Sequence, residues 1–159
     1  MGAKSEALAK QFEAKAQEAV AILEKLSDAD WKKVTEAEKW TVGVTAHHLA
    51  RALEAVAGIV TGIVSGQSRG NFTRAMLDEM NAQHAKEHAN CTKAETVALH
   101  KKNAAAAAAI VRGLDDAQLD HTGTVLTGMP PMSAAQFVER ALIGHIDEHI
   151  GSIRATVGG

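Results

Sequence analysis

The sequence predicts an all-α protein, a four-helix bundle with one short extra helix, in a single domain over residues 1–159. Only two of the 159 residues are prolines, the adjacent Pro130 and Pro131, so almost the whole chain can be helical. Alanine, the strongest helix former, is the commonest residue, and the alternation of β-branched residues that is typical of strands is absent. Four long segments with helical spacing of apolar residues are what a four-helix bundle requires.

The first two long helices are predicted over residues 3–26 and 42–64. In the first, apolar residues recur at steps of three and four with Lys and Glu between them, which is typical of an amphipathic helix. The second is apolar on nearly every side, which indicates a central and buried helix. Between them, Ser27 is expected to cap a short helical turn.

The second half of the chain is predicted to contain three further helices, over residues 72–89, 92–112 and 134–156. The helix over residues 72–89 is more polar, and its expected anchors are Met76, Leu77 and Met80. The other two have start and stop signals: a Thr92–Glu95 capping box, a C-cap at Gly113 and an N-cap at Ser133. Residues 115–131 are expected to be irregular.

Composition restricts the partners and the location of the protein. A net charge of −2 and a pI near 6.4 argue against a nucleic-acid or anionic membrane partner, and 3% aromatic residues argue against base stacking. The single cysteine, Cys91, excludes an internal disulfide and fits a reducing compartment. Because neither a signal core nor a bilayer-spanning apolar run is present, we expect a soluble, cytoplasmic protein.

Eight histidines are many for this length, and three of them have the spacing of a metal site. His145 and His149 lie four residues apart, so they project from one face of the last helix. His48 lies inside the buried second helix, where an imidazole is costly unless its nitrogens have partners. The sequence therefore predicts a metal site at His48, His145 and His149, with positions left open for water or substrate. The alternative is three packed histidines that bond to carbonyls or water.

The face that carries His145 and His149 should point into the bundle because it is otherwise mostly apolar. It is shared with Ala134, Val138, Ala141, Leu142 and Ser152.

A second pair, His84 and His88, has the same spacing, and Cys91 could complete a set of two nitrogens and one sulfur. The segment around this pair is polar and lies near a helix break, which favours solvated histidines or histidines at the rim of a site. His47 points about a quarter-turn away from His48.

His100 and His121 are both predicted at the surface. His100 stands beside two lysines, and His121 lies in the long irregular segment. A loop histidine such as His121 could still reach the mouth of a pocket.

Two carboxylates, Asp147 and Glu148, stand between the paired histidines. Glu148 projects about 60° from His145 around the helix axis, near enough to orient a ligand or act as a general base. We therefore take Glu148 as the candidate catalytic residue. Asp147 points away and is expected to be solvated.

The order of several short motifs adds a family resemblance. Trp40-Thr41-Val42-Gly43 enters the second helix, His48-Leu49 begins eight residues after Trp40, Met80-Asn81 and Thr92-x-x-Glu95 follow, and His145-x₃-His149-x-Gly151-x-Ile153 closes the series. In order and spacing these motifs resemble the DinB/YfiT-like family of metal-dependent helical bundles. The resemblance extends from the first helix to about Arg154.

The resemblance implies a four-helix bundle of unusual connectivity in which His48, His145 and His149 hold one divalent metal ion, zinc or nickel. Characterised relatives include transferases and isomerases that use the thiol cofactors bacillithiol or mycothiol, and some hydrolases. Many members are homodimers. The His-Gly-Trp-Asp-type ending of the mycothiol-dependent isomerases is missing here, and Ile150 replaces a frequent basic residue; the missing ending counts against isomerase activity.

These observations together predict a metal-dependent transferase or hydrolase that acts on a small molecule. The metal would activate a low-molecular-weight thiol or a water by lowering its pKa. The alternative is a non-catalytic, metal- or small-molecule-binding stress-response dimer, in which the same histidines are structural. An open coordination position beside a pocket would distinguish the enzyme from the alternative.

Overall fold

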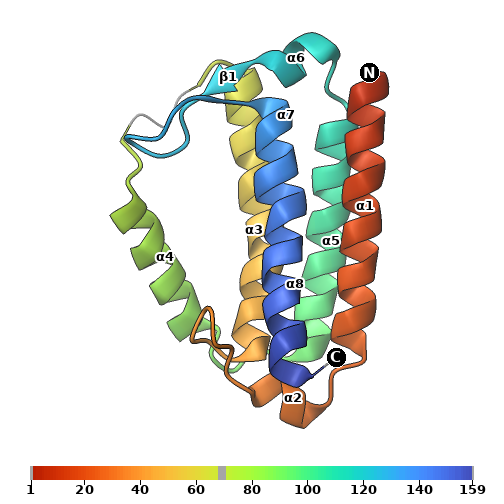
Figure 1. Ribbon diagram of the computed structural model, residues 1–159, viewed down its shortest axis with the longest axis vertical. Coiled ribbons are helices and arrows are strands. Elements are labelled where there is room, and N and C mark those ends of the chain that lie inside the picture. The colour runs from red at the N-terminus through yellow and green to blue at the C-terminus, as the bar shows by residue number, and fades with distance from the viewer. Residues whose placement is uncertain (1, 68–70, 159) are drawn as a thin grey trace.

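The computed structural model describes residues 2–67 and 71–158 and confirms the predicted all-α four-helix bundle (Figure 1). The long helices are α1 (Ala3–Glu24), α3 (Val42–Val64), α5 (Lys93–Arg112) and a last composite helix of α7 (Ala134–Phe137), the π-helical η1 (Val138–Ile143) and α8 (Gly144–Val157). The shorter helices are α2 (Asp28–Lys32), α4 (Arg74–Glu87) and α6 (Asp116–Asp120). Two short strands, β1 (Thr122–Gly123) and β2 (Met132–Ser133), pair antiparallel.

Helix α3 is the central helix, as its apolar pattern predicts. It packs against both α5 and α8, and Leu49, Leu53 and Val60 are fully buried. Helix α5 also packs along α1, and its Ala107 and Ala108 are buried.

The predicted helix caps are present. The Ser27 and Ser133 hydroxyls accept hydrogen bonds from the backbone N–H groups three residues later. Thr92 and Glu95 form the reciprocal capping box that starts α5, and Gly113 caps its C-terminus. A further box, between Asp115 and Gln118, starts α6 inside the segment that the sequence predicted to be irregular.

The last helix differs from the prediction, because η1 interrupts the regular α-helix just before His145. Here the N–H of Gly144 donates to the carbonyl of Glu139, five residues earlier, and a Cβ on Gly144 would lie only 3.3 Å from that oxygen. A π turn shifts the residues before it relative to those after it. The predicted face nevertheless points into the bundle, because each of its residues is buried or half-buried. In α8 the buried side chains are those of Ile146, His149, Ile150 and Ile153.

Helix α4 stands apart from the four long helices, and its C-terminal end approaches α3 (Figure 1). Of the predicted anchors, Met76 and Met80 are 47% and 44% exposed, so the prediction was wrong for these two, whereas Leu77 is half-buried. Within Arg74–Glu87, all of which the structure describes, the one buried residue is His84. Helix α4 therefore buries little apolar surface, and its most deeply buried side chain is a polar one.

Across residues 2–67 and 71–158, no helix combines the length and the apolar character that are needed to cross a bilayer.

Candidate metal centre

The three predicted ligands, His48 of α3 and His145 and His149 of α8, lie together. A ring nitrogen of each lies within 4.8 Å of one from each of the others. The ring centroids are 5.3 Å apart for His48 and His145, 4.9 Å for His48 and His149, and 4.5 Å for His145 and His149. A tetrahedral zinc site with Zn–N bonds of about 2.1 Å separates its nitrogens by about 3.4 Å. Small side-chain rotations would therefore bring these nitrogens to coordinating distances.

A carboxylate that the sequence analysis missed holds one of these histidines. Nδ1 of His149 lies 2.8 Å from Oε2 of Glu38, and the Ser152 hydroxyl donates to Oε1 of the same carboxylate at 2.6 Å. Both side chains are buried, with 9% of Glu38 and 8% of His149 exposed. Because a carboxylate accepts, Nδ1 carries the proton and Nε2 keeps its lone pair for a metal ion.

The loop before α3 places Glu38 against α8. The backbone N–H of Thr35 donates to the carbonyl of Trp40, and Lys39 between them has a left-handed φ of 63°. This closes a tight turn with Glu38 on it. Thr41 then caps α3 by accepting from the N–H of Val44, so the helix that carries His48 begins directly after the turn.

Burial lowers the pKa of two histidines of this cluster, His48 and His145, and so favours the neutral form that binds metal. Burial is the main cause that lowers the pKa of His48 to about 3, and the neighbouring His149 and His145 add to it. Burial also lowers the pKa of His145 to about 4. For Glu38, burial alone would raise the pKa, but hydrogen bonds from Ser152, Thr35 and His149 outweigh it and lower the pKa. The cluster therefore combines neutral imidazoles at His48 and His145 with an ionised carboxylate at Glu38.

The ring of Trp40 lies 5.1 Å from that of His48, centroid to centroid, and tilted against it. Trp40, which begins the Trp40-Thr41-Val42-Gly43 motif, thus packs against the predicted ligand His48. Glu148, the candidate catalytic residue, lies on the exposed side of α8. The carboxylate that contacts a predicted ligand is Glu38, whereas the side chain of Glu148 faces solvent.

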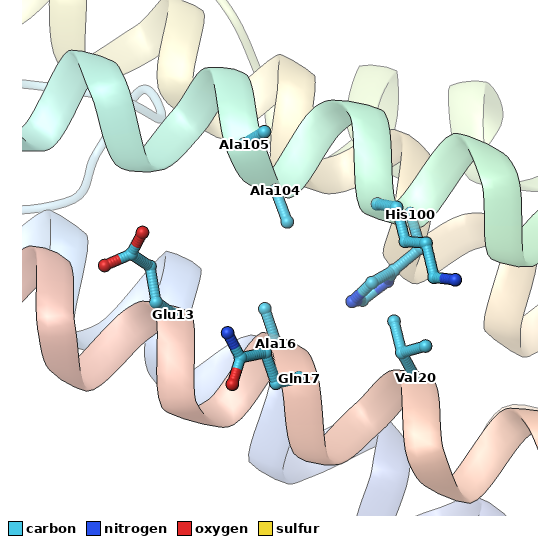
Figure 2. A pocket seen from close by; sticks show the side chains of 8 residues that line it. Glu13, Ala16, Gln17, Val20, His100, Ala104 and Ala105 are labelled. Carbon is cyan, nitrogen blue, oxygen red and sulfur yellow. The ribbon is translucent and has the colours of Figure 1, made fainter.

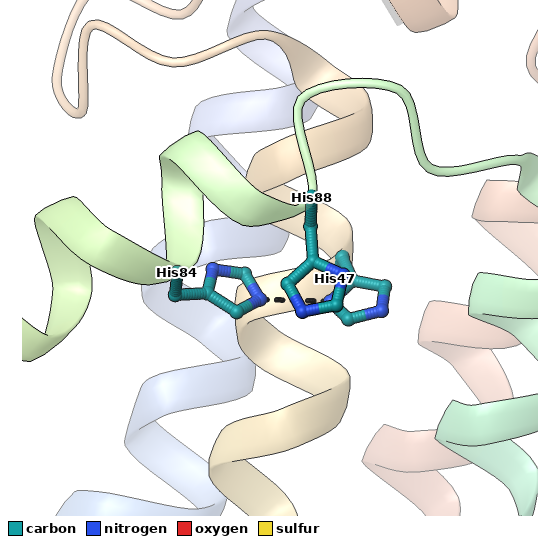
Figure 3. Close-up of side chains that lie close together, drawn as sticks. All are labelled: His47, His84 and His88. Carbon is teal, nitrogen blue, oxygen red and sulfur yellow. Dashed lines mark hydrogen bonds between the residues drawn. The ribbon is translucent and has the colours of Figure 1, made fainter.

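A second cluster forms around His47, which neighbours His48 on α3. His47 meets His84 and His88 from the end of α4, and the three also bring ring nitrogens within 4.8 Å of one another (Figure 3). His84 is 1% exposed and His88 is half-buried. The expectation that this pair is solvated or at the rim was therefore wrong for His84, and His47 rather than Cys91 is its third partner.

The two remaining histidines, His121 and His100, differ in their exposure to solvent. His121 is exposed and lies in neither cluster. His100 is fully buried, contrary to its predicted surface position. It borders a cavity of about 270 Å³ between α1 and α5, whose other lining residues include Glu13, Gln17 and Ala104 (Figure 2). Helices α1 and α5, which border this cavity, lie on the opposite side of the bundle from α4 (Figure 1).

The bundle and its histidine cluster define the class of the protein, the DinB/YfiT-like helical bundles. Residues 12–143 match the mycothiol maleylpyruvate isomerase N-terminal domain family, and the chain belongs to that family. The matched segment contains His48 and ends directly before α8, so the pairing with His145 and His149 rests on the closing motif and on the geometry.

One solved structure extends the likeness over the whole fold. The chain is similar to YfiT from Bacillus subtilis, with a TM-score of 0.67 and 19% sequence identity over 98% of this chain and 86% of that chain. That protein is described as "a probable metal-dependent hydrolase with an unusual four-helix bundle topology". At this identity the likeness shows the fold. Among curated proteins, none matches the sequence significantly.

Proposed function

We propose that this protein is a metal-dependent enzyme that uses a divalent ion, zinc or nickel, at His48, His145 and His149. The reaction is transfer or hydrolysis on a small-molecule substrate, with a low-molecular-weight thiol or a water as the nucleophile. The observation that carries the proposal is the convergence of three buried or half-buried imidazoles, with Nδ1 of His149 held by Glu38 at 2.8 Å.

The donor set fits such an ion. Three neutral imidazoles suit zinc and nickel, and three protein ligands leave positions for an exogenous group. When bound, the ion lowers the pKa of a coordinated water or thiol and polarises an electrophile. The chain supplies the rest: burial keeps His48 and His145 unprotonated, and Glu38 keeps the Nε2 lone pair of His149 free.

Glu148 is the proposed general base. It follows His145 by three residues on α8 and is exposed, so its carboxylate can accept a proton from an incoming thiol or water at the mouth of the site. Glu148→Gln keeps the size of the side chain and removes the base. This variant should retain the metal and lose turnover, which separates a catalytic role from a metal-binding one.

Cobalt substitution tests both the site and the thiol. The Co²⁺-loaded protein should bind one ion at this cluster and gain a thiolate-to-cobalt absorption band when bacillithiol or mycothiol is added. His145→Ala should abolish the band, whereas His88→Ala, outside the cluster, should retain it. A bound ion without any thiol band would favour water as the nucleophile.

The non-catalytic alternative makes a different prediction for the same sample. A closed coordination sphere, with no spectral response to thiol, azide or water exchange, would favour a structural site. If His48→Ala, His145→Ala and His149→Ala all keep the full metal content of the parent protein, the proposal is wrong. The proposal also includes a homodimer, and a monomeric mass by light scattering at micromolar concentration would contradict that part.

A further inference from the structure

The attachment of α4 to the bundle raises a physical question. A helix usually docks by burying an apolar stripe, yet α4 exposes Met76 and Met80, leaves Leu77 half-buried and buries His84. Burial of a neutral imidazole without full hydrogen bonding costs free energy rather than supplying it. A favourable interaction at His84 would offset that cost and add to the small apolar contact.

The surroundings of His84 indicate what that interaction is. Nε2 of His84 lies 2.8 Å from Nδ1 of His47, and Nδ1 of His84 has no hydrogen-bond partner in the described part of the chain. His88 completes the group, with its ring centroid 4.1 Å from that of His47 and 4.7 Å from that of His84 (Figure 3). Three imidazoles from two separate elements therefore converge, and two of them are buried.

We propose that His47, His84 and His88 form a second divalent-metal site, which fastens the end of α4 to α3. Three imidazole nitrogens are a donor set for a borderline cation such as Zn²⁺. Without an ion, His47 and His84 share one hydrogen bond, because only one of the two facing nitrogens can donate. An ion placed among the three rings would instead form a bond to a nitrogen lone pair of each.

The local geometry allows the ligands to adjust around an ion. The three nitrogens lie within 4.8 Å of one another, and a tetrahedral zinc site separates them by about 3.4 Å. The pair of His47 and His84, at 2.8 Å, would have to open slightly to admit the ion. His88 is the C-cap of α4, directly after its last helical residue, so its ring and backbone can adjust without unwinding the helix.

The nearby charges largely balance. The field of Glu95 acts on His47 and that of Glu87 acts on His84, and both favour a cation. Arg51 acts on both histidines in the opposite sense. The bonds to nitrogen must therefore supply the affinity, which is the usual situation for zinc in a histidine site.

The second site adjoins the first. His47 and His48 are consecutive and point to different clusters, and the ring centroids of His48 and His84 are 5.9 Å apart. An ion at the second site would hold His84, and with it α4, beside the first metal cluster. Its role would be structural, because it positions the helix that flanks the candidate active site.

Metal stoichiometry of the full chain tests this proposal. Chelator-treated protein is titrated with Zn²⁺ and analysed after removal of unbound ions. The parent protein should bind two ions, and His88→Ala and His84→Gln should each bind one. His145→Ala should also bind one, from the other cluster, and the control His121→Ala should bind two because His121 is exposed and outside both clusters.

Hydrogen exchange gives a second result that a histidine cluster without metal would not produce. Addition of Zn²⁺ should slow amide exchange over residues 74–87 in the parent protein and in His145→Ala, but not in His88→Ala. If His84→Gln does not fold, the half-buried His88 decides the test, since its truncation leaves the buried pair intact.

The failures of the two metal proposals are distinguishable. One ion in the parent protein, retained by His88→Ala and lost from His145→Ala, would overturn the second site and leave the first. One ion retained by His145→Ala and lost from His88→Ala would overturn the first site and support the second. No bound ion in the parent protein would overturn both.

Discussion

At the scale of single residues, Glu38 fixes the orientation of the His149 ring, the proposed metal ligand. Its carboxylate receives hydrogen bonds from Nδ1 of His149 and from Ser152, and those bonds lower its pKa despite burial. A carboxylate in this position fixes the tautomer of a ligand histidine and raises its basicity.

Glu38→Gln tests this role. The amide keeps the size of the side chain but loses the charge and can present a donor to His149, so metal affinity at this cluster should fall about 10–100-fold. Competitive titration of the zinc-loaded protein with a chromophoric chelator measures the change. The matched control is Glu36→Gln, an exposed residue on the same loop, which should leave affinity unchanged. Equal affinities for the two variants would show that Glu38 has no part in metal binding.

His100 is the second residue with a measurable consequence. It is fully buried, and both of its ring nitrogens lack a hydrogen-bond partner in the described part of the chain. Burial lowers its pKa to about 4. Between about pH 6.5 and that value, the unfolded chain binds a proton at this position that the folded chain does not. The stability of the folded state that depends on a neutral His100 is therefore fully present above about pH 6.5. It is lost as the pH falls toward the folded-state pKa of His100.

His100→Leu should remove this acid sensitivity. With chelator-treated protein, so that no metal contributes, the melting temperature of the variant should fall less between pH 7 and pH 5 than that of the parent protein. Each unit of pKa shift corresponds to about 1.4 kcal/mol. His121→Leu, in an exposed position, should show the same fall as the parent. If the melting temperatures of His100→Leu and the parent protein fall equally, His100 is not the source of the acid sensitivity.

At the scale of elements, the contact between α2 and α3 depends on a glycine. The indole N–H of Trp31 donates to the carbonyl of Cys91 at 2.9 Å, which fixes the ring over the first turn of α3. A Cβ on Gly43 would overlap Nε1 of Trp31 and lie 2.6 Å from Cε2. Only glycine lets the indole approach the helix this closely.

Gly43→Ala should therefore lower the free energy of unfolding by about 1–3 kcal/mol, the usual cost of overpacking. Gly58→Ala is the matched control, because it lies in the same helix and its added Cβ would meet nothing within 4 Å. That variant should gain about 0.5–1 kcal/mol from helix propensity. Urea denaturation of both variants measures the difference, and a gain in stability for both would exclude the clash.

At the scale of the whole molecule, metal binding and folding are linked. Ions that bind only the folded chain stabilise it by RT ln(1 + [L]/Kd), and both histidine clusters join elements that are distant in sequence. The metal-loaded protein should therefore melt at a higher temperature than the chelator-treated protein at neutral pH.

Acid should reduce that difference. Each ligand must be neutral to bind, and burial already lowers the pKa of His48 and His145. Protons therefore compete with the ion for these two nitrogens only as the pH approaches about 4 and about 3. The gap between the two melting temperatures should persist to about pH 5 and shrink only below it. Identical melting curves at neutral pH would rule out both metal sites.

The sequence by itself determined the parts of this protein that depend on near neighbours. The four long helices follow from apolar spacing within a few turns, and the starts at Ser27, Thr92 and Ser133 follow from caps that act over three residues. The shared face of His145 and His149 needs only the rise and turn of one helix. The half-buried position of His48 in the central helix follows from its apolar neighbours.

Only the tertiary structure decided which side chains meet across the chain. Glu38 reaches His149 over 111 positions, through a turn with a left-handed Lys39 that no local pattern predicts. His84 looked solvated because its own helix is polar, yet α4 folds against α3 and buries it beside His47. Local periodicity indicates which face of a helix is apolar. The partner of a polar face is determined by packing of the whole chain, because buried polar atoms are tolerated only where another element supplies their contacts.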